Sequence, residues 1–172
     1  MTIVVALVAL MTAQVTDHVQ SKTPTPVLSV CDVLATDPTK LNGRVITVRG
    51  QLGSTYHGMY LISECKTHLL TKGLKWGNDI SVYAEVADEN VARPWDRFGK
   101  ELTRLHADLR RDKVIVTIVG RLETRDSLND MVVPGPDGPA RLGFGHMNGS
   151  PAEIDLLSIE VNEVNRAHVP PR

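Results

Sequence analysis

Two short segments carry the side chains best suited to hold a ligand. "STYHG" contains Tyr56 and His57, and "LGFGHMNG" contains Phe144 and His146. Imidazole and phenol groups stack and form hydrogen bonds, and imidazole also ligates metals. The two segments lie far apart in the chain, so any joint chemistry requires a fold that brings them together. The alternative is that Phe144 packs on the core and both histidines are only solvated.

Recognised catalytic and phosphate-binding motifs do not occur in this sequence. The glycines of "GFGHMNG" fit neither the dinucleotide fingerprint nor the P-loop, and they precede a predicted strand instead of a helix. HExxH and GxSxG are absent. We therefore predict no catalytic residue, no cofactor and no metal site. A metal-dependent hydrolase using His57 and His146, with His68 as a further ligand, is retained as an alternative.

A second surface offers the ingredients of single-stranded nucleic-acid binding, which needs stacking rings beside a basic groove. Trp76 lies close to Lys72 and Lys75, and Tyr83 follows on the next predicted strand. We expect Trp76 on an open face in this alternative. The wider composition argues against it, because aromatic residues make up 4% of the chain and the formal net charge is −1. The sequence therefore carries no strong nucleic-acid signal.

The chain has two cysteines, Cys31 and Cys65. An even pair in an exported protein is most simply one disulfide. The bridge would close a loop of about 35 residues and contribute roughly 3–4 kcal/mol. Two unpaired buried thiols are the alternative.

The N-terminal segment "MTIVVALVALMTA" resembles the hydrophobic region of a secretory signal peptide. Its apolar run, residues 3–11, is too short to cross a bilayer, which needs roughly 20 residues. We predict a signal peptide over residues 1–13, a flexible linker over 14–26, one domain over 27–166 and a disordered tail over 167–172. The chain is then periplasmic or secreted and has no membrane anchor after cleavage. A buried N-terminal strand is the alternative for residues 3–11.

Alternating and helical apolar patterns predict the elements of this domain. Ser29 and Asp32 predict a capped helix, the stripe from Trp95 to Leu109 predicts a long one, and a phase slip near Leu157 predicts a bulge. In chain order we expect a helix at 29–36, strands at 44–54, 59–64 and 79–86, a helix at 93–112, a strand at 113–124, a loop at 134–151 and a strand at 152–164.

This order resembles the OB-fold, a five-stranded Greek-key barrel with a helix between its third and fourth strands. The resemblance covers roughly residues 43–164. The predicted fold class is accordingly mainly β, with the 29–36 helix as an N-terminal addition. Two segments, "CDVLATDPTKLNGRVITVRG" and "GFGHMNGSPAEIDLLSIEVNEV", are also similar to uncharacterised exported bacterial proteins of this arrangement. That likeness implies export and brings no catalytic residue with it. Another small β-barrel or an open α+β sheet is the alternative fold.

OB-folds usually bind ligands across their second and third strands, between the 1–2 and 4–5 loops. The resemblance therefore implies a ligand rim formed by Tyr56, His57, Phe144 and His146. We expect a non-catalytic module that binds a protein, a peptide or a small ligand on this face.

Overall fold

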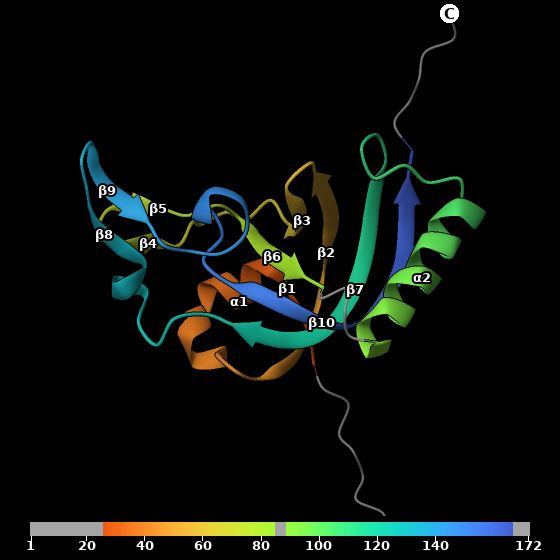
Figure 1. Cartoon of the computed structure of the whole chain (residues 1–172), viewed down its shortest axis with the longest axis horizontal. Helices are drawn as coiled ribbons and strands as arrows, with labels where there is room; N and C mark the ends of the chain where they lie inside the picture. The colour runs from red at the N-terminus through yellow and green to blue at the C-terminus, as the bar shows by residue number, and fades with distance from the viewer. Residues whose placement is uncertain (1–25, 85–88, 167–172) are drawn as a thin grey trace, which may run out of the picture.

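The structure, a computed structural model, describes residues 26–84 and 89–166 (Figure 1). The predicted signal peptide, most of the predicted linker and the predicted tail lie outside these residues. In chain order the elements are β1 (Val27–Ser29), α1 (Val30–Ala35), η1 (Pro38–Leu41), β2 (Val45–Thr55), β3 (Gly58–Ile62), β4 (Leu70–Thr71), β5 (Leu74–Lys75), β6 (Asp79–Tyr83), α2 (Glu89–Arg104), β7 (Lys113–Glu123), η2 (Leu128–Met131), β8 (Val132–Gly135), β9 (Gly138–Arg141), η3 (His146–Asn148) and β10 (Glu153–Asn165).

The main sheet has the order β1-β2-β3-β6-β10-β7, and β7 also pairs with β2. The five strands β2, β3, β6, β10 and β7 therefore form a closed ring of hydrogen bonds. The β6–β10 pair is parallel, and the other pairs of the ring are antiparallel. The predicted order of three strands, a helix and two strands is observed for the long elements β2, β3, β6, α2, β7 and β10.

The core lies inside this ring because alternate residues of each strand point inward. Its fully buried members include Val48, Leu52, Leu61, Ile80, Val114, Val116, Ile118, Leu122, Ile154 and Leu156. α1 adds Val30 and Val33 to the same cluster, and α2 adds Phe98. In Figure 1, α2 runs beside the upper parts of β7 and β10.

Gly50 and Gly120 both allow a close approach, but to different neighbours. A Cβ at Gly50 would lie 2.9 Å from Cγ2 of Val30 in α1, and one at Gly120 would overlap Ile154 and lie 2.5 Å from the carbonyl oxygen of Asp155. Both glycines are therefore required by close packing in their strands. The predicted bulge in β10 is confirmed, because its register against β7 shifts between Leu156 and Ser158.

The N-terminal helix follows the prediction closely. The Ser29 hydroxyl accepts a hydrogen bond from the Asp32 amide, and the Asp32 carboxylate accepts one from the Ser29 amide. This reciprocal capping box satisfies two amides that lack helical partners. The helix ends at Ala35, and Pro38 begins the short 3₁₀ turn η1.

The long helix α2 differs from its prediction at both ends. It begins at Glu89, so Pro94 lies inside the helix and not in the first turn. It ends at Arg104 because His106 adopts φ 50° and the amide of Ala107 donates to the carbonyl of Leu102. This is a Schellman closure with histidine in the position that glycine usually occupies. The apolar periodicity continues beyond this closure and did not reveal it.

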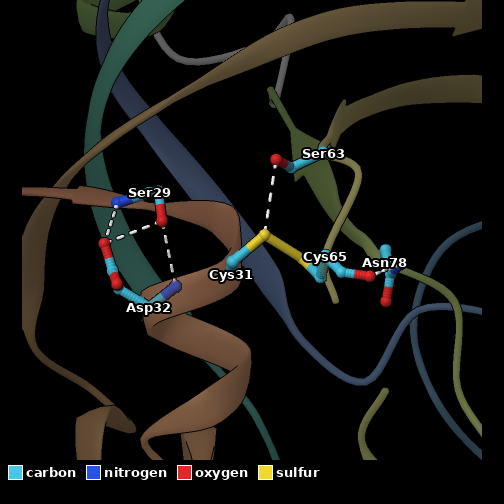
Figure 2. The surroundings of a disulfide bond; sticks show 6 residues. All are labelled: Ser29, Cys31, Asp32, Ser63, Cys65 and Asn78. Carbon is cyan, nitrogen blue, oxygen red and sulfur yellow. Dashed lines mark hydrogen bonds between the residues drawn. A yellow bond between two sulfur atoms is a disulfide. The ribbon is translucent and has the colours of Figure 1, made fainter. Parts of the chain in front are cut away.

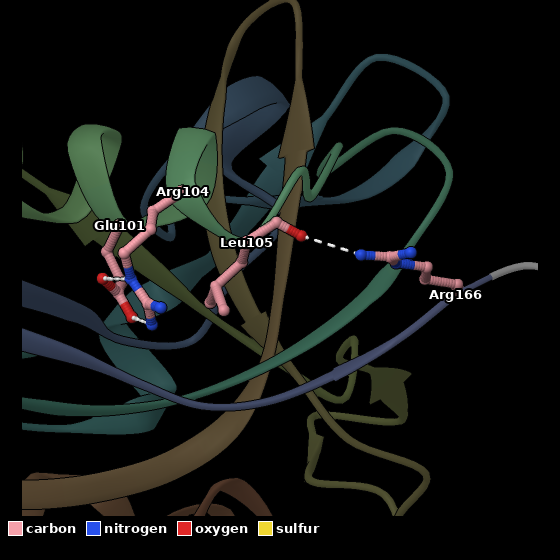
Figure 3. A network of polar contacts seen from close by, with 4 residues as sticks. All are labelled: Glu101, Arg104, Leu105 and Arg166. Atoms are coloured by element: carbon pink, nitrogen blue, oxygen red, sulfur yellow. Dashed lines mark hydrogen bonds and ion pairs between the residues drawn. The ribbon is translucent and has the colours of Figure 1, made fainter.

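Polar contacts hold the exposed face and the end of α2 (Figure 3). Arg104 donates to both oxygens of Glu101, three residues earlier on the same helix face. Nη2 of Arg166 donates to the carbonyl oxygen of Leu105 at 3.1 Å and joins the end of β10 to the end of α2.

Two small hairpins, β4–β5 and β8–β9, lie outside the ring. The second of them occupies the stretch predicted as a loop over 134–151, so that prediction is wrong there. Hairpin strands so short and rich in glycine and proline lack the alternation that marks a strand. Within the described part of the chain, no helix is long and apolar enough to cross a bilayer.

Candidate functional site

Two of the four predicted rim residues meet above the ring. His57 lies in the turn between β2 and β3, and His146 lies in η3, on the connection from β7 to β10. Their imidazole rings are stacked, with centroids 3.9 Å apart and planes inclined by 7°. The fold therefore joins two segments that the sequence separates by nearly ninety residues.

The backbone around His146 is tightly constrained. Its amide donates to the Tyr60 hydroxyl of β3 at 3.0 Å. Gly145 lies so close to the sheet that a Cβ there would be 2.9 Å from Oγ of Ser81. Met147 and Asn148 follow with positive φ values of 55° and 54°. Left-handed backbone is costly for such residues, and it often occurs at functional sites.

On the other side of the stack, Tyr56 supports His57. Their rings meet edge to face, with centroids 5.2 Å apart and planes inclined by 85°. The His57 amide also donates to Oγ1 of Thr55. Tyr56 itself is 95% exposed, which makes it the most accessible large side chain of this rim.

A pocket of about 720 Å³ lies beside the histidine pair. It is lined by Thr55, His57, Tyr60, Ile62, Gly77, Asn78, Asp79, Arg141, His146, Gly149 and Ser150. The walls are therefore the β2–β3 turn, strands β3 and β6, and the connection from β7 to β10. The volume falls within the range of small-molecule sites.

Charged and polar groups are fixed around this pocket. Nη2 of Arg141 donates to the carbonyl oxygen of Lys75 at 2.6 Å, and its guanidinium carbon lies 5.8 Å from the centre of the Trp76 ring. The Ser150 hydroxyl donates to Oδ2 of Asp79. The pocket thus presents one held cation and one carboxylate that is already hydrogen-bonded.

Phe144, the fourth predicted rim residue, has a different role. It packs against a second hydrophobic cluster formed by Trp76, Met131 and Val132, and the Arg125 guanidinium lies 5.7 Å from its ring centre. Its backbone pairs with Ser150. Phe144 therefore matches the alternative in which its ring packs on the protein and supports the loop.

The expectation that Trp76 lies on an open face is wrong. Its side chain is 1% exposed, and Nε1 donates to Oγ1 of Thr71 at 3.0 Å. The indole fills the space under the hairpins that the sequence did not reveal. Lys72 and Lys75 are exposed, although Nζ of Lys72 donates to the carbonyl of Val132, and Tyr83 is 48% exposed. The nucleic-acid alternative therefore loses its central stacking ring.

The stacked histidines lack further metal ligands. Among residues 26–84 and 89–166, no three His, Cys, Asp or Glu side chains are grouped so that they could hold a metal ion. The alternative set of His57, His146 and His68 is therefore not assembled.

The predicted disulfide is confirmed, and a pocket residue is hydrogen-bonded to one of its cysteines (Figure 2). It joins Cys31 of α1 to Cys65, and the Ser63 hydroxyl lies 3.4 Å from Sγ of Cys31. Nδ2 of Asn78, a pocket residue, donates to the carbonyl oxygen of Cys65 at 3.4 Å. The bond fits an oxidising environment.

Several pocket residues lie outside the predicted rim. Tyr60, Ile62 and Asp79 occupy outward positions on β3 and β6, where Ile62 pairs with Asp79. Strand alternation together with the OB resemblance could have identified them. Arg141 had no such signal, because it lies on the unrecognised β8–β9 hairpin, and Ser150 lies in the stretch predicted as a loop.

Glu153 lies next to the loop that carries His146. Its Oε2 accepts a hydrogen bond from the Ser81 hydroxyl at 2.9 Å. Burial raises the pKa of the Glu153 carboxyl, the Ser81 hydrogen bond opposes this, and the nearby Asp155 and Glu123 carboxylates add to the rise. Ionised Glu153 is thus less favourable in the folded chain than in water.

We expect Glu153→Gln to stabilise the protein at neutral pH. The pKa of Glu153 is higher in the folded chain than in the unfolded chain. At pH values between these two pKa values the folded chain binds more protons than the unfolded chain, so the free energy of unfolding falls as the pH rises. The variant removes that loss and retains an acceptor for Ser81. Urea unfolding should show a gain at pH 7 that disappears near about pH 3.5, where the wild-type carboxyl is protonated in both states. An equal gain at both pH values would show that the charge is not the cause.

Comparison with known proteins identifies no family for this chain. No protein-family model matches it, and no curated protein matches it. Among solved structures, it is similar to a chain described as an aspartyl-tRNA synthetase from Leishmania major Friedlin, with 13% sequence identity and a TM-score of 0.41. The alignment covers 83% of this chain and 22% of the synthetase chain, so this chain spans less than a quarter of that protein's length. A likeness at this level assigns no functional residue.

Proposed function

We propose that the protein is an exported, non-catalytic binding module built on an OB-type barrel. The ring order β2-β3-β6-β10-β7 supports the barrel, together with the parallel β6–β10 pair and the position of α2 between β6 and β7. These are the features of a five-stranded Greek-key barrel with a helix between its third and fourth strands. In this assignment α1 and β1 are additions before the first barrel strand.

The observation that carries the proposal is the position of the pocket. It lies over the second and third strands of the proposed barrel, β3 and β6, between the 1–2 and 4–5 connections. OB-type proteins bind ligands on this face. His57 comes from the first connection, and His146 and Arg141 come from the second. The ligand would be a small molecule, a peptide or an exposed segment of a protein.

Charge supports this proposal over the binding of a nucleic-acid strand. Outward positions next to the pocket hold Asp79, Glu153 and Asp155, since each pairs with an outward residue of the neighbouring strand. Carboxylates along this face disfavour the many successive phosphates of a nucleic-acid strand. With Trp76 buried, Tyr83 is the exposed aromatic ring left on β6, and neither β6 nor β10 carries a lysine or an arginine.

The pocket assignment can be tested by two-dimensional amide NMR of the folded protein with a set of small probes. The set would contain aromatic acids, aliphatic acids, amino acids and tripeptides. We expect shifts at His57, Tyr60, His146 and Ser150. The apolar pocket of the β8–β9 hairpin provides the internal comparison, with Val133 as its reporter. Shifts confined to that hairpin, or no shifts with any probe, would contradict the proposal.

Export can be tested separately by expressing the full chain in a bacterium and measuring the mass of the product outside the cytoplasm. We expect a chain without residues 1–13 that is two hydrogens lighter than its reduced form. An uncut cytoplasmic product with two free thiols would refute export.

A further inference from the structure

We propose that His57 and His146 are the two jaws of a clamp that opens to hold a planar heteroaromatic ring carrying an acidic group. This inference rests on the proposed function, because it names the ligand class of the same pocket. In the closed state, which the structure shows, the two imidazoles stack directly on each other and leave no space between them. The acidic group would pair with Arg141.

The first argument is the geometry of the stack. The rings come from separate connections, and their 3.9 Å separation at 7° is a face-to-face contact between flat surfaces. An aromatic ring is about 3.5–4 Å thick in such contacts. A ligand ring would therefore fit between the imidazoles when their spacing is roughly doubled, and each face of the ligand would gain the contact that the histidines now give each other.

The second argument is that the jaws can separate without disturbing the core. His57 and His146 are both exposed side chains, so rotation about their side-chain bonds needs no repacking. Their backbone amides are fixed by different groups of the β2–β3 hairpin, the His57 amide by Thr55 and the His146 amide by Tyr60. Opening is therefore a local change at the mouth of an existing pocket.

The third argument concerns the acidic group. Arg141 takes part in neither of the ion pairs found among the described side chains, Arg104–Glu101 and Arg111–Asp108. Its hydrogen bond to the Lys75 carbonyl and its position over the Trp76 ring fix the guanidinium at the pocket wall. A guanidinium held in this way is suited to a carboxylate or a phosphate.

The fourth argument concerns the heteroatom. Oδ1 of Asn78, a pocket residue, is buried without a hydrogen-bond partner among the described residues. A buried acceptor without a partner is costly. A ring N–H, as in indole, could satisfy this oxygen after a small rotation of the amide, whereas a hydrocarbon ring could not.

The same geometry disfavours a metal ion between the histidines. The nitrogen lone pairs of an imidazole lie in the plane of the ring, and the two planes are parallel. They therefore do not converge on one point, and a shared metal would need both rings to turn. Stacking needs only the ring faces, and this difference can be tested with phenylalanine.

The test is a calorimetric and NMR titration of the wild-type protein with indole-3-acetate, indole and acetate, and in a second arm with adenosine monophosphate. We expect indole-3-acetate to bind at the pocket at least about tenfold more tightly than indole or acetate, because both parts of the ligand contribute. The affinities for indole-3-acetate and for adenosine monophosphate are then compared, which shows whether the pocket prefers a carboxylate or a phosphate group.

Matched variants separate ring stacking from imidazole chemistry. His57→Ala and His146→Ala should each weaken indole-3-acetate binding about tenfold, whereas His57→Phe and His146→Phe should stay within about threefold of the wild type. Arg141→Gln should weaken indole-3-acetate but not indole. His68→Ala, at an exposed histidine outside the pocket, is the control. Unfolding midpoints should be nearly unchanged in all of these variants, because the replaced side chains are exposed.

Three results would overturn the clamp. One is unchanged binding in the double variant His57→Ala/His146→Ala, and another is equal binding of aliphatic and aromatic acids. The third is loss of binding in the phenylalanine variants together with zinc binding by the wild type, which would show a metal site. If pocket resonances respond to peptides or aliphatic acids only, the binding module stands and the clamp fails. If they respond to no probe, both proposals fail.

Discussion

Replacing Trp76 with alanine is expected to lower the free energy of unfolding by about 3–5 kcal/mol. The indole is 1% exposed and forms the centre of the second cluster with Met131 and Val132. The substitution leaves a large cavity and removes the hydrogen bond from Nε1 to Thr71. It also removes the ring beneath the Arg141 guanidinium. Urea denaturation followed by circular dichroism would measure the loss.

The control is Trp76→Phe, which keeps an aromatic ring and loses the indole N–H. We expect this variant to lose less than half as much stability as the alanine variant. A loss below about 1 kcal/mol for Trp76→Ala would mean that the indole is solvated. The open aromatic face of the nucleic-acid alternative would then deserve renewed study.

Removing the disulfide with Cys31→Ser/Cys65→Ser is expected to cost about 3–4 kcal/mol. The bond closes a loop with a sequence separation of 34 residues, so it restricts the unfolded chain considerably. It also attaches α1 to the segment that leads into β6 and the pocket. Urea denaturation of both proteins, with and without a reductant, measures the effect.

The reductant provides the control within this experiment. It should destabilise the wild type by nearly the same amount and leave the serine variant unchanged. Ser63→Ala, which removes the hydroxyl beside Sγ of Cys31 but keeps the bond, should have a much smaller effect. Wild-type protein that is equally stable in reductant would show that the bond does not restrict the unfolded state.

The long elements could be predicted because their burial repeats with a simple period. β2, β7 and β10 bury alternate residues, and the slip of that alternation near Leu157 marked a real bulge. The end of α2 could not be predicted, because His106 takes a left-handed conformation there and histidine, unlike glycine, is not a signal for it. The hairpins were missed because their strands are two to four residues long, which is too short for an alternating pattern to show.

The candidate site was predictable in part, for a related reason. His57 and His146 were placed on facing loops by analogy of strand order, and the structure stacks them. Phe144 and Trp76 were expected at the surface, but each packs into the second cluster. The sequence does not distinguish an aromatic residue that contacts a ligand from one that packs in a small hydrophobic cluster when both lie in polar segments. For Phe144 and Trp76, the position of the β8–β9 hairpin decides, because Val132 of that hairpin belongs to the cluster in which both rings pack.

The closed ring also affects how copies of this protein meet in concentrated solution. A strand with one unpaired side can recruit the same strand of a neighbour and begin aggregation. Here β1, with three residues, ends the sheet, and β10 pairs with β6 only over residues 153–155. The remaining length of β10 carries two register shifts and the exposed Glu160 and Glu163, and it lies beside α2. Charge, irregular register and a neighbouring helix each oppose strand addition, so we expect this domain to remain dispersed where a flat sheet of similar size would polymerise.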